Sequence, residues 1–238
     1  MSPNRLGLGS RAMGFDLVDG LRSLDTYDDV WRFIRGFAAE WVSPIRERDD
    51  VTPEEFDEAE ERLGVRLPEA VRQAYQLIGR NPNLTSRSGA LYEIDELEYD
   101  PDSRMLTFRC THQATAFFSM PVRSWDDDPP VYVDFPYRPE PYTDRFSINL
   151  VELVLWETAE AGDRSDGRQL TDYDGDLLDG LTPLSTLLPA MEWNKPWHIS
   201  PDVILRRTGD LITIAARTDE ALTDFRAAHP GDWMGRWH

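Results

Sequence analysis

The stretch that decides the fold is residues 105–135, "MLTFRCTHQATAFFSMPVRSWDDDPPVYVDF", in which apolar and polar side chains alternate. Alternation with a period of two is typical of strands that bury one face. Three successive strands are predicted here. In the first of them, Leu106, Phe108 and Cys110 share one face, and Thr107 and Arg109 share the other. The links are short, and the turn 111–113 suits a hairpin, so neighbouring strands are expected to pair antiparallel.

Before this stretch the apolar period is 3.6, which indicates helices. Residues 26–42 carry one apolar stripe. Residues 52–55, "TPEE", form a capping box with proline at the first helical position, and Gly64 ends the helix that they start. Pro68 starts a third helix, and Gly79 is expected at its end in the left-handed conformation.

After this stretch a helix, a hairpin and a second helix are predicted. The apolar run 148–160, capped by Ser147, indicates a largely buried helix, and residues 162–180 are predicted to form a polar loop. Residues 202–217 indicate a hairpin, and Thr218 caps a short helix. Helices around a run of antiparallel strands indicate an α+β fold, mostly antiparallel sheet with flanking N-terminal, central and C-terminal helices.

Length and composition limit the class of protein. The chain has 238 residues, 40% of them apolar, which suffices for a sizeable core in one large domain or two small ones. Cys110 is the single cysteine, so no internal disulfide can form. The first residues lack the apolar core of a secretory signal, and no apolar run approaches the roughly 20 residues that span a bilayer. We therefore expect a cytoplasmic protein without a membrane partner.

The net charge of −19 is the most pronounced compositional feature. A chain this acidic repels nucleic acid and anionic lipid and attracts basic surfaces. The expected partner is therefore a basic protein surface and not a nucleic acid. A charge that serves only solubility is the alternative.

Candidate chemistry is sparse. His112 lies on the predicted hairpin turn. No sequence motif pairs it with a nucleophile or with a group that would orient its ring for catalysis. Asp172, Asp174 and Asp176 alternate as calcium ligands do, but Leu177 and Pro183 occupy the positions where an EF-hand needs glycine and glutamate. A weak ion site and an ordinary acidic loop both stay open there. We predict no catalytic residue, no metal and no cofactor.

The loop between the second and third predicted strands combines tryptophan with acid. Asp128 before Pro129-Pro130 is explained by turn geometry, because proline restricts the preceding residue and suits the start of a strand. No backbone rule requires Trp125, Asp126 or Asp127, and tryptophan beside carboxylates is the composition of a protein-contact rim. A solvated turn is the alternative. The predicted partner-binding residues are Trp125, Asp126, Asp127, Asp134, His112, Asp172, Asp174 and Asp176.

Residues 51–84, "VTPEEFDEAEERLGVRLPEAVRQAYQLIGRNPNL", resemble the opening of the SUKH superfamily, the Smi/Knr-related proteins, with Leu63-Gly64 and Leu67-Pro68 at the "LG…LP" junction. Residues 128–131, "DPPV", and Gln113 resemble two further segments of that family. The turn before the glutamine departs from the family's "E-N-Q", since it reads Thr-His-Gln here. The resemblance divides the chain into an N-terminal extension with one amphipathic helix (1–48), a SUKH-like domain (49–229) and a C-terminal tail (230–238).

The resemblance implies a function. SUKH proteins include immunity proteins of bacterial polymorphic-toxin systems, which bind a cognate toxin without catalysis. The implied partner is a cognate toxin domain with a basic surface, of nuclease type. A scaffold or regulatory role, as in fungal members, is the alternative within the superfamily. A hydrolase that uses carboxylates is the alternative outside it.

Overall fold

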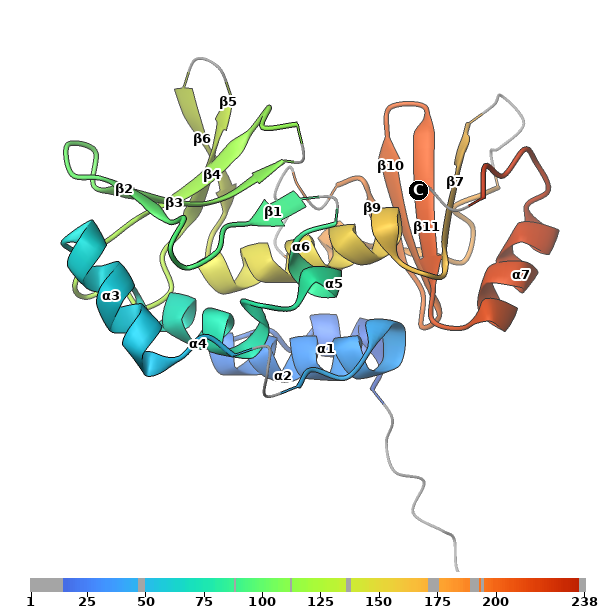
Figure 1. Cartoon of the computed structure of the whole chain (residues 1–238). Coiled ribbons are helices and arrows are strands. Elements are labelled where there is room, and N and C mark those ends of the chain that lie inside the picture. The colour runs from blue at the N-terminus through green and yellow to red at the C-terminus, as the bar shows by residue number, and fades with distance from the viewer. Residues whose placement is uncertain are drawn as a thin grey trace, which may run out of the picture.

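The computed structural model describes residues 15–46, 50–87, 89–111, 113–135, 138–170, 176–188, 193 and 195–235. Two antiparallel sheets lie side by side, and α6 (Phe146–Ala161) runs beneath both (Figure 1). Helices α1 (Leu17–Leu21), α2 (Tyr27–Phe37) and α4 (Glu69–Ile78) lie on the other side of α6 from the sheets (Figure 1). The predicted α+β class is confirmed.

The helices before the first strand are α1 (Leu17–Leu21), α2 (Tyr27–Phe37), the π-helix Ala38–Val42, α3 (Pro53–Leu63), α4 (Glu69–Ile78) and α5 (Pro82–Thr85). The predicted capping box at Thr52 is present, and Gly64 ends α3 in the left-handed conformation, with a φ of 67°. The prediction for Gly79 is wrong, since its φ is −55°. Glycine is needed there for space, because a Cβ would lie 2.6 Å from the carbonyl oxygen of Tyr75.

The first sheet contains β1 (Gly89–Leu91), β2 (Glu98–Asp100), β3 (Met105–Thr111), β4 (Phe117–Pro121), β5 (Val131–Phe135) and β6 (Arg138–Thr143). Its strand order is β1-β3-β4-β5-β6, and β2 also pairs with β3. The three strands predicted from the alternation are β3, β4 and β5, and their antiparallel pairing is confirmed.

A β-bulge in β3 overturns the prediction that Arg109 and Thr107 share one face of the strand. The register shifts between these two residues, and Arg109 pairs with Phe118, whose side chain is buried. A bulge inserts one residue and so moves the following side chains to the opposite faces. Arg109 is therefore 1% exposed, and Cys110 lies on the partly exposed side.

The second sheet contains β7 (Ser165–Gln169), β8 (Thr182–Pro183), β9 (Trp197–Ile199), β10 (Val203–Thr208) and β11 (Leu211–Ala216), in the order β7-β11-β10-β9-β8. A 3-10 helix, Leu184–Thr186, follows β8, and α7 (Asp219–Ala228) follows β11. The predicted hairpin 202–217 is confirmed, and Thr218 caps α7 as predicted. The predicted polar loop 162–180 is wrong in part, since β7 lies within it.

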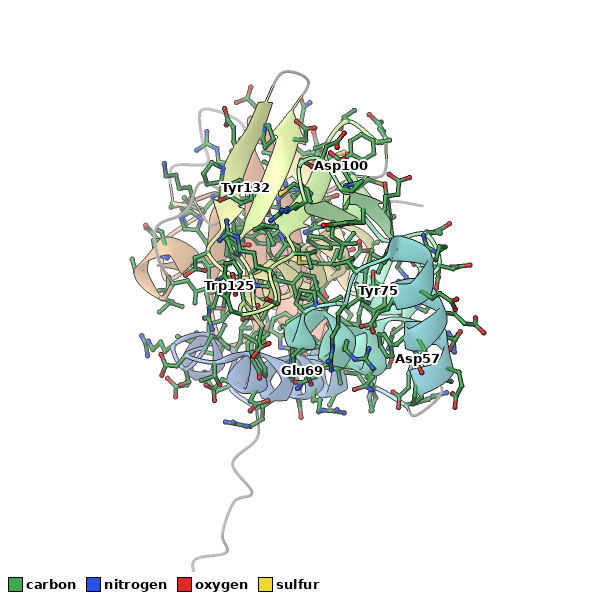
Figure 2. The ribbon with its side chains drawn as sticks, turned by 90° about the vertical axis from the view of Figure 1, so that its left-hand side faces the viewer. Asp57, Glu69, Tyr75, Asp100, Trp125 and Tyr132 are labelled. Atoms are coloured by element: carbon green, nitrogen blue, oxygen red, sulfur yellow. The ribbon has the colours of Figure 1, made fainter. Side chains whose placement is uncertain are left out.

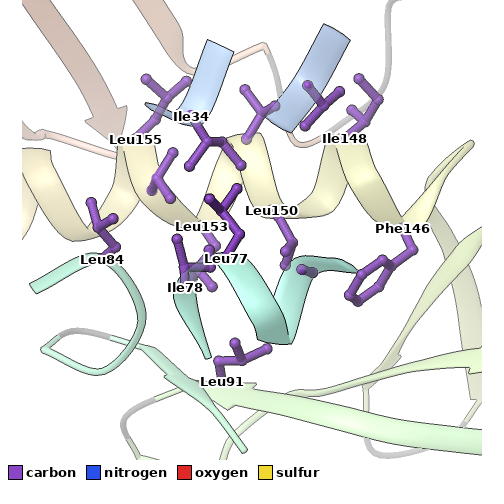
Figure 3. Packing of buried hydrophobic residues seen from close by; sticks show 14 of the residues in the cluster. Ile34, Leu77, Ile78, Leu84, Leu91, Phe146, Ile148, Leu150, Leu153 and Leu155 are labelled. Atoms are coloured by element: carbon purple, nitrogen blue, oxygen red, sulfur yellow. The ribbon is translucent and has the colours of Figure 1, made fainter. Parts of the chain in front are cut away.

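Helix α6 is the centre of the main hydrophobic core. It starts at Phe146, with Arg145 at the N-cap, so the predicted cap at Ser147 is wrong. Apolar residues occur all round the helix, as expected for a helix that is buried on every side. Figure 3 shows Leu150 and Leu153 of α6 among residues of α2 and α4, such as Ile34 and Leu77.

The core extends across the predicted boundary at residue 48. Val30, Ile34 and Phe37 of α2 are fully buried in the same cluster as the core residues of α6 and the first sheet. The stripe predicted over 26–42 therefore faces the core, although its last turn is a π-helix. The boundary marks where the family resemblance begins and is not an edge of the packing.

The C-terminal tail lies along β7, the edge strand of the second sheet. The backbone N–H of Met234 donates to the carbonyl of Gly167 over 2.9 Å. The N–H of Gly235 donates to the buried carboxylate of Asp166 over 2.8 Å. The described part of the predicted tail, residues 230–235, is thus attached to the sheet.

Candidate functional site

The loop between β4 and β5, residues 122–130, carries the most exposed large apolar side chain that the structure describes. Trp125 exposes 79% of its surface, whereas Phe117 on the neighbouring strand exposes 39%. Figure 2 shows Trp125 on the left-hand face of the molecule, above Glu69 and below Tyr132.

This loop is hydrogen-bonded to two helices, α4 and α6. The carbonyl oxygen of Asp127 accepts a hydrogen bond of 2.9 Å from the N–H of Ala70, in the first turn of α4. The carboxylate of Asp128 accepts from the N–H and the hydroxyl of Ser147, in the first turn of α6, over 2.8 and 2.6 Å. The loop that carries Trp125 is therefore anchored two and three residues further along the chain, which lowers the entropy that binding would cost.

Asp128 has a structural role. Burial raises the pKa of its carboxyl, while the hydrogen bonds from Ser147 and the charge of Arg145 lower it. Its two oxygens are bonded to the start of α6, so Asp128 joins the loop to the central helix. The sequence prediction that Asp128 is explained by structure and not by contact agrees with this geometry.

Several carboxylates surround the loop. Burial is the largest cause of the raised pKa of the Tyr27 hydroxyl. The negative charges of Asp127, Asp28 and Glu69 act on the same hydroxyl and raise its pKa further. Tyr27 begins α2 and Glu69 begins α4, so two helix N-termini, where acidic groups are stabilised, meet beside the loop. We call the following residues the Trp125 surface: Tyr27, Asp28, Glu69, Trp125, Asp126 and Asp127.

The composition of the Trp125 surface suits a cationic partner. Four of its six members are carboxylates, and Asp126 and Asp127 form no salt bridge with any residue in the described ranges. An indole face attracts Arg or Lys by a cation–π interaction, and carboxylates accept charge-assisted hydrogen bonds from the same groups. Arg123 is the only basic residue in the loop itself.

Two further predicted site residues, Asp134 and Asp176, are described by the structure, and neither joins this surface. Asp134 is exposed on β5, but it lies three residues beyond Val131, about 10 Å along the strand from the loop. Asp176 is exposed next to Leu177, whose side chain is buried against the second sheet. His112, Asp172 and Asp174 lie outside the described residues. Among the predicted site residues that the structure describes, Trp125, Asp126 and Asp127 are the ones that lie together.

Sequence reasoning missed Tyr27, Asp28 and Glu69. Acidic residues in the first turn of a helix are common because the helix dipole favours them, so these residues carried no signal of function. Only the packing of α2 and α4 beside the loop makes them neighbours of Trp125.

A second cluster combines tryptophan with charge, inside the molecule. Glu152, Trp156 and Glu160 follow one another at intervals of four along α6 and so share one face. Arg109 Nη1 donates to Glu152 Oε2 over 2.7 Å, and both side chains are 1% exposed. Arg206 of β10 pairs with Glu160. We call the following residues the polar interior: Arg109, Asn149, Glu152, Trp156, Glu160 and Arg206.

The polar interior links the two sheets. Arg109 comes from the first sheet and Arg206 from the second, and their guanidinium carbons lie 5.4 and 3.9 Å from the centre of the Trp156 ring. Arg109 also lies 4.5 Å from the ring centre of Phe118. Sequence reasoning missed this cluster because the bulge in β3 turns Arg109 inward. Since its central ion pair is buried, the cluster does not offer a contact surface.

In the part of the chain that the structure describes, no group of three or more His, Cys, Asp or Glu side chains is placed to hold a metal ion. None of the described helices combines the length and apolarity that a membrane span requires.

Comparisons with models of protein families, with curated proteins and with solved structures gave no match.

Proposed function

We propose that this chain is a non-catalytic immunity protein that binds and neutralises a cognate bacterial polymorphic toxin with a basic surface, through the Trp125 surface. The proposal is carried by one observation, the 79% exposure of Trp125 on a loop that is hydrogen-bonded to α4 and α6. The resemblance of residues 51–84 to the SUKH superfamily supports the class of partner.

The exposed indole favours a contact surface over a solvated turn. Burying a large apolar side chain typically stabilises by about 1.5–3 kcal/mol, and Trp125 does not gain this in the isolated chain. Tryptophan is also enriched among the residues that carry most of the binding energy in protein interfaces. A partner that covers Trp125 would supply the missing burial.

The charge of the chain favours a basic partner. A nuclease-type toxin binds phosphates in a basic groove, and the carboxylates of the Trp125 surface would occupy such a groove in place of phosphates. The net charge of −19 would steer the encounter and raise the association rate.

Neutralisation is the property to test. The reading frame beside this gene is expected to encode a large secreted protein with a small basic C-terminal domain. Expression of that domain alone should stop bacterial growth, co-expression of this chain should restore growth, and Trp125→Ala should weaken the rescue. Phe117→Ala is the matched aromatic control and should rescue fully. A metabolic operon beside the gene, together with no binding to any basic domain encoded there, would refute the proposal.

A further inference from the structure

The side of the first sheet that faces away from the core adjoins the Trp125 surface. Successive side chains of a strand point to opposite sides of the sheet. In β5, Val131 and Val133 are buried in the core, so Tyr132 between them points to the outer side, where it is half-buried. Tyr132 follows the end of the loop by two residues, about 7 Å along the strand. Figure 2 shows Tyr132 and Trp125 on the same face of the molecule.

Tyr132 begins a row of paired residues that crosses the sheet. It pairs with Ser119 of β4, Ser119 pairs with Thr107 of β3, and Thr107 pairs with Glu98 of β2. We call these four residues the outer row. Neighbouring strands lie about 4.8 Å apart, so the outer row extends about 14 Å from Tyr132 to Glu98. Ser119 is small and 8% exposed between its larger neighbours, whereas Glu98 at the far end is exposed.

The Trp125 surface alone is smaller than a stable protein contact. Specific interfaces cover about 800 Å² on each partner, with about 20–30 residues a side. The Trp125 surface has six members, so a toxin that binds it must also contact neighbouring surface. Helix α2, which starts at Tyr27, and the outer side of the first sheet both adjoin it.

The charges of these two neighbouring surfaces differ. Beyond the first turn of α2, Arg32 and Arg35 are exposed, and they would repel a basic partner. On the outer side of β2 to β5, the described charged residues are Glu98, Asp100 and Asp134, all acidic. The outer side of the sheet therefore continues the sign of charge of the Trp125 surface, and the body of α2 does not.

On the basis of the proposed function, we infer that the contact with the basic toxin domain continues from the Trp125 surface across the outer row. Tyrosine is enriched at protein interfaces, where its ring packs and its hydroxyl forms hydrogen bonds, so Tyr132 is the aromatic contact of the row. A lysine or arginine of the toxin lies opposite Glu98, because carboxylates accept charge-assisted hydrogen bonds from these groups. Phe117, two residues before Ser119 on β4 and further from the loop, lies beyond this contact.

Binding is measured between the full chain and the small basic domain encoded beside the gene. Tyr132→Arg should weaken binding at least about ten-fold, because it places a positive charge against the basic partner. Glu98→Lys should weaken binding about three-fold or more, since it reverses a charge at the rim. Ala227→Arg and Asp224→Lys make the same changes of net charge at exposed positions of α7, far from the first sheet (Figure 1), and should bind like the wild type.

The outcomes separate this inference from the proposed function. Wild-type affinity of a folded Tyr132→Arg or of Glu98→Lys, or equal losses in the α7 variants, overturns the continuation across the outer row. If Trp125→Ala still weakens binding, the proposed function stands. If Tyr132→Arg fails to fold in a melting experiment, Glu98→Lys decides, because its side chain is exposed. Wild-type affinity of Trp125→Ala overturns the proposed function and the continuation with it.

Discussion

The Trp125 surface and the polar interior are built from the same kinds of side chain, but in opposite environments. In the polar interior Arg109 and Glu152 are 1% exposed and 2.7 Å apart, and Trp156 lies against both arginines. On the Trp125 surface the indole is 79% exposed, and all the charged members of this surface are acidic. Charges that are buried must be paired, whereas charges of one sign at the surface remain available to a partner. Tryptophan with charge therefore indicates structure in one place and, as we propose, recognition in the other.

The largest expected effect is in the polar interior. Glu152→Gln should lower the free energy of unfolding by about 3–5 kcal/mol, because it leaves the buried guanidinium of Arg109 without its counter-charge. Denaturation with urea measures this difference. The double variant Arg109→Met with Glu152→Leu removes both charges and should recover most of the loss. A single variant as stable as the wild type would mean that Arg109 does not need Glu152 as its counter-charge, and the contrast between the two clusters would fail.

The next effect is on the Trp125 surface and concerns binding alone. Trp125→Ala should weaken binding to the basic partner by about 2 kcal/mol or more, mainly through faster dissociation. Its melting temperature should stay that of the wild type, because the indole is exposed. Rate constants and melting curves are compared with those of Phe117→Ala. A lowered melting temperature with unchanged dissociation would make Trp125 part of the fold.

A smaller effect is expected from the charges. Asp126→Asn with Asp127→Asn should lower the association rate about 3- to 10-fold at low salt and flatten its dependence on ionic strength. Dissociation should change little. Asp57→Asn with Glu58→Gln makes the same change of net charge on α3, away from Trp125 (Figure 2). Equal effects of the two double variants would show that net charge acts without a localised surface.

The smallest effect concerns how the free energy of unfolding depends on pH. Burial raises the pKa of Asp128 in the folded chain above its unfolded value, so its contribution to stability is present at low pH and is lost as the pH rises through the folded pKa. Relative to the wild type, Asp128→Asn should therefore become more stable from about pH 4 to about pH 7. The altered bond to Ser147 shifts the whole curve and not its slope. A constant difference between the two proteins across this range would contradict the expected shift.

The elements set by local rules could be predicted from the sequence. The capping box at Thr52, the helix end at Gly64 and the hairpin of β10 and β11 depend on neighbouring residues, and all three are present. Trp125, which no backbone rule requires, is exposed, and its role as a contact residue stays a prediction.

The features that depend on distant partners could not be predicted. Alternation placed Arg109 outside, because the bulge that turns it inward leaves no mark in the sequence. β7 could not be predicted because its sequence is polar. The buried Asp166 in this strand accepts its hydrogen bond from Gly235, almost 70 residues away. Similarly, Ser147 resembles a helix cap, but its hydroxyl donates to Asp128 in a loop of the first sheet.

The C-terminal tail along β7 has a consequence for association between copies of the chain. β7 is an edge of its sheet, and an open edge can template the addition of a strand from another molecule. The N–H of Met234 takes the carbonyl of Gly167 that such a strand would use. Truncation after residue 229 would uncover this edge, and the truncated chain is expected to aggregate through it.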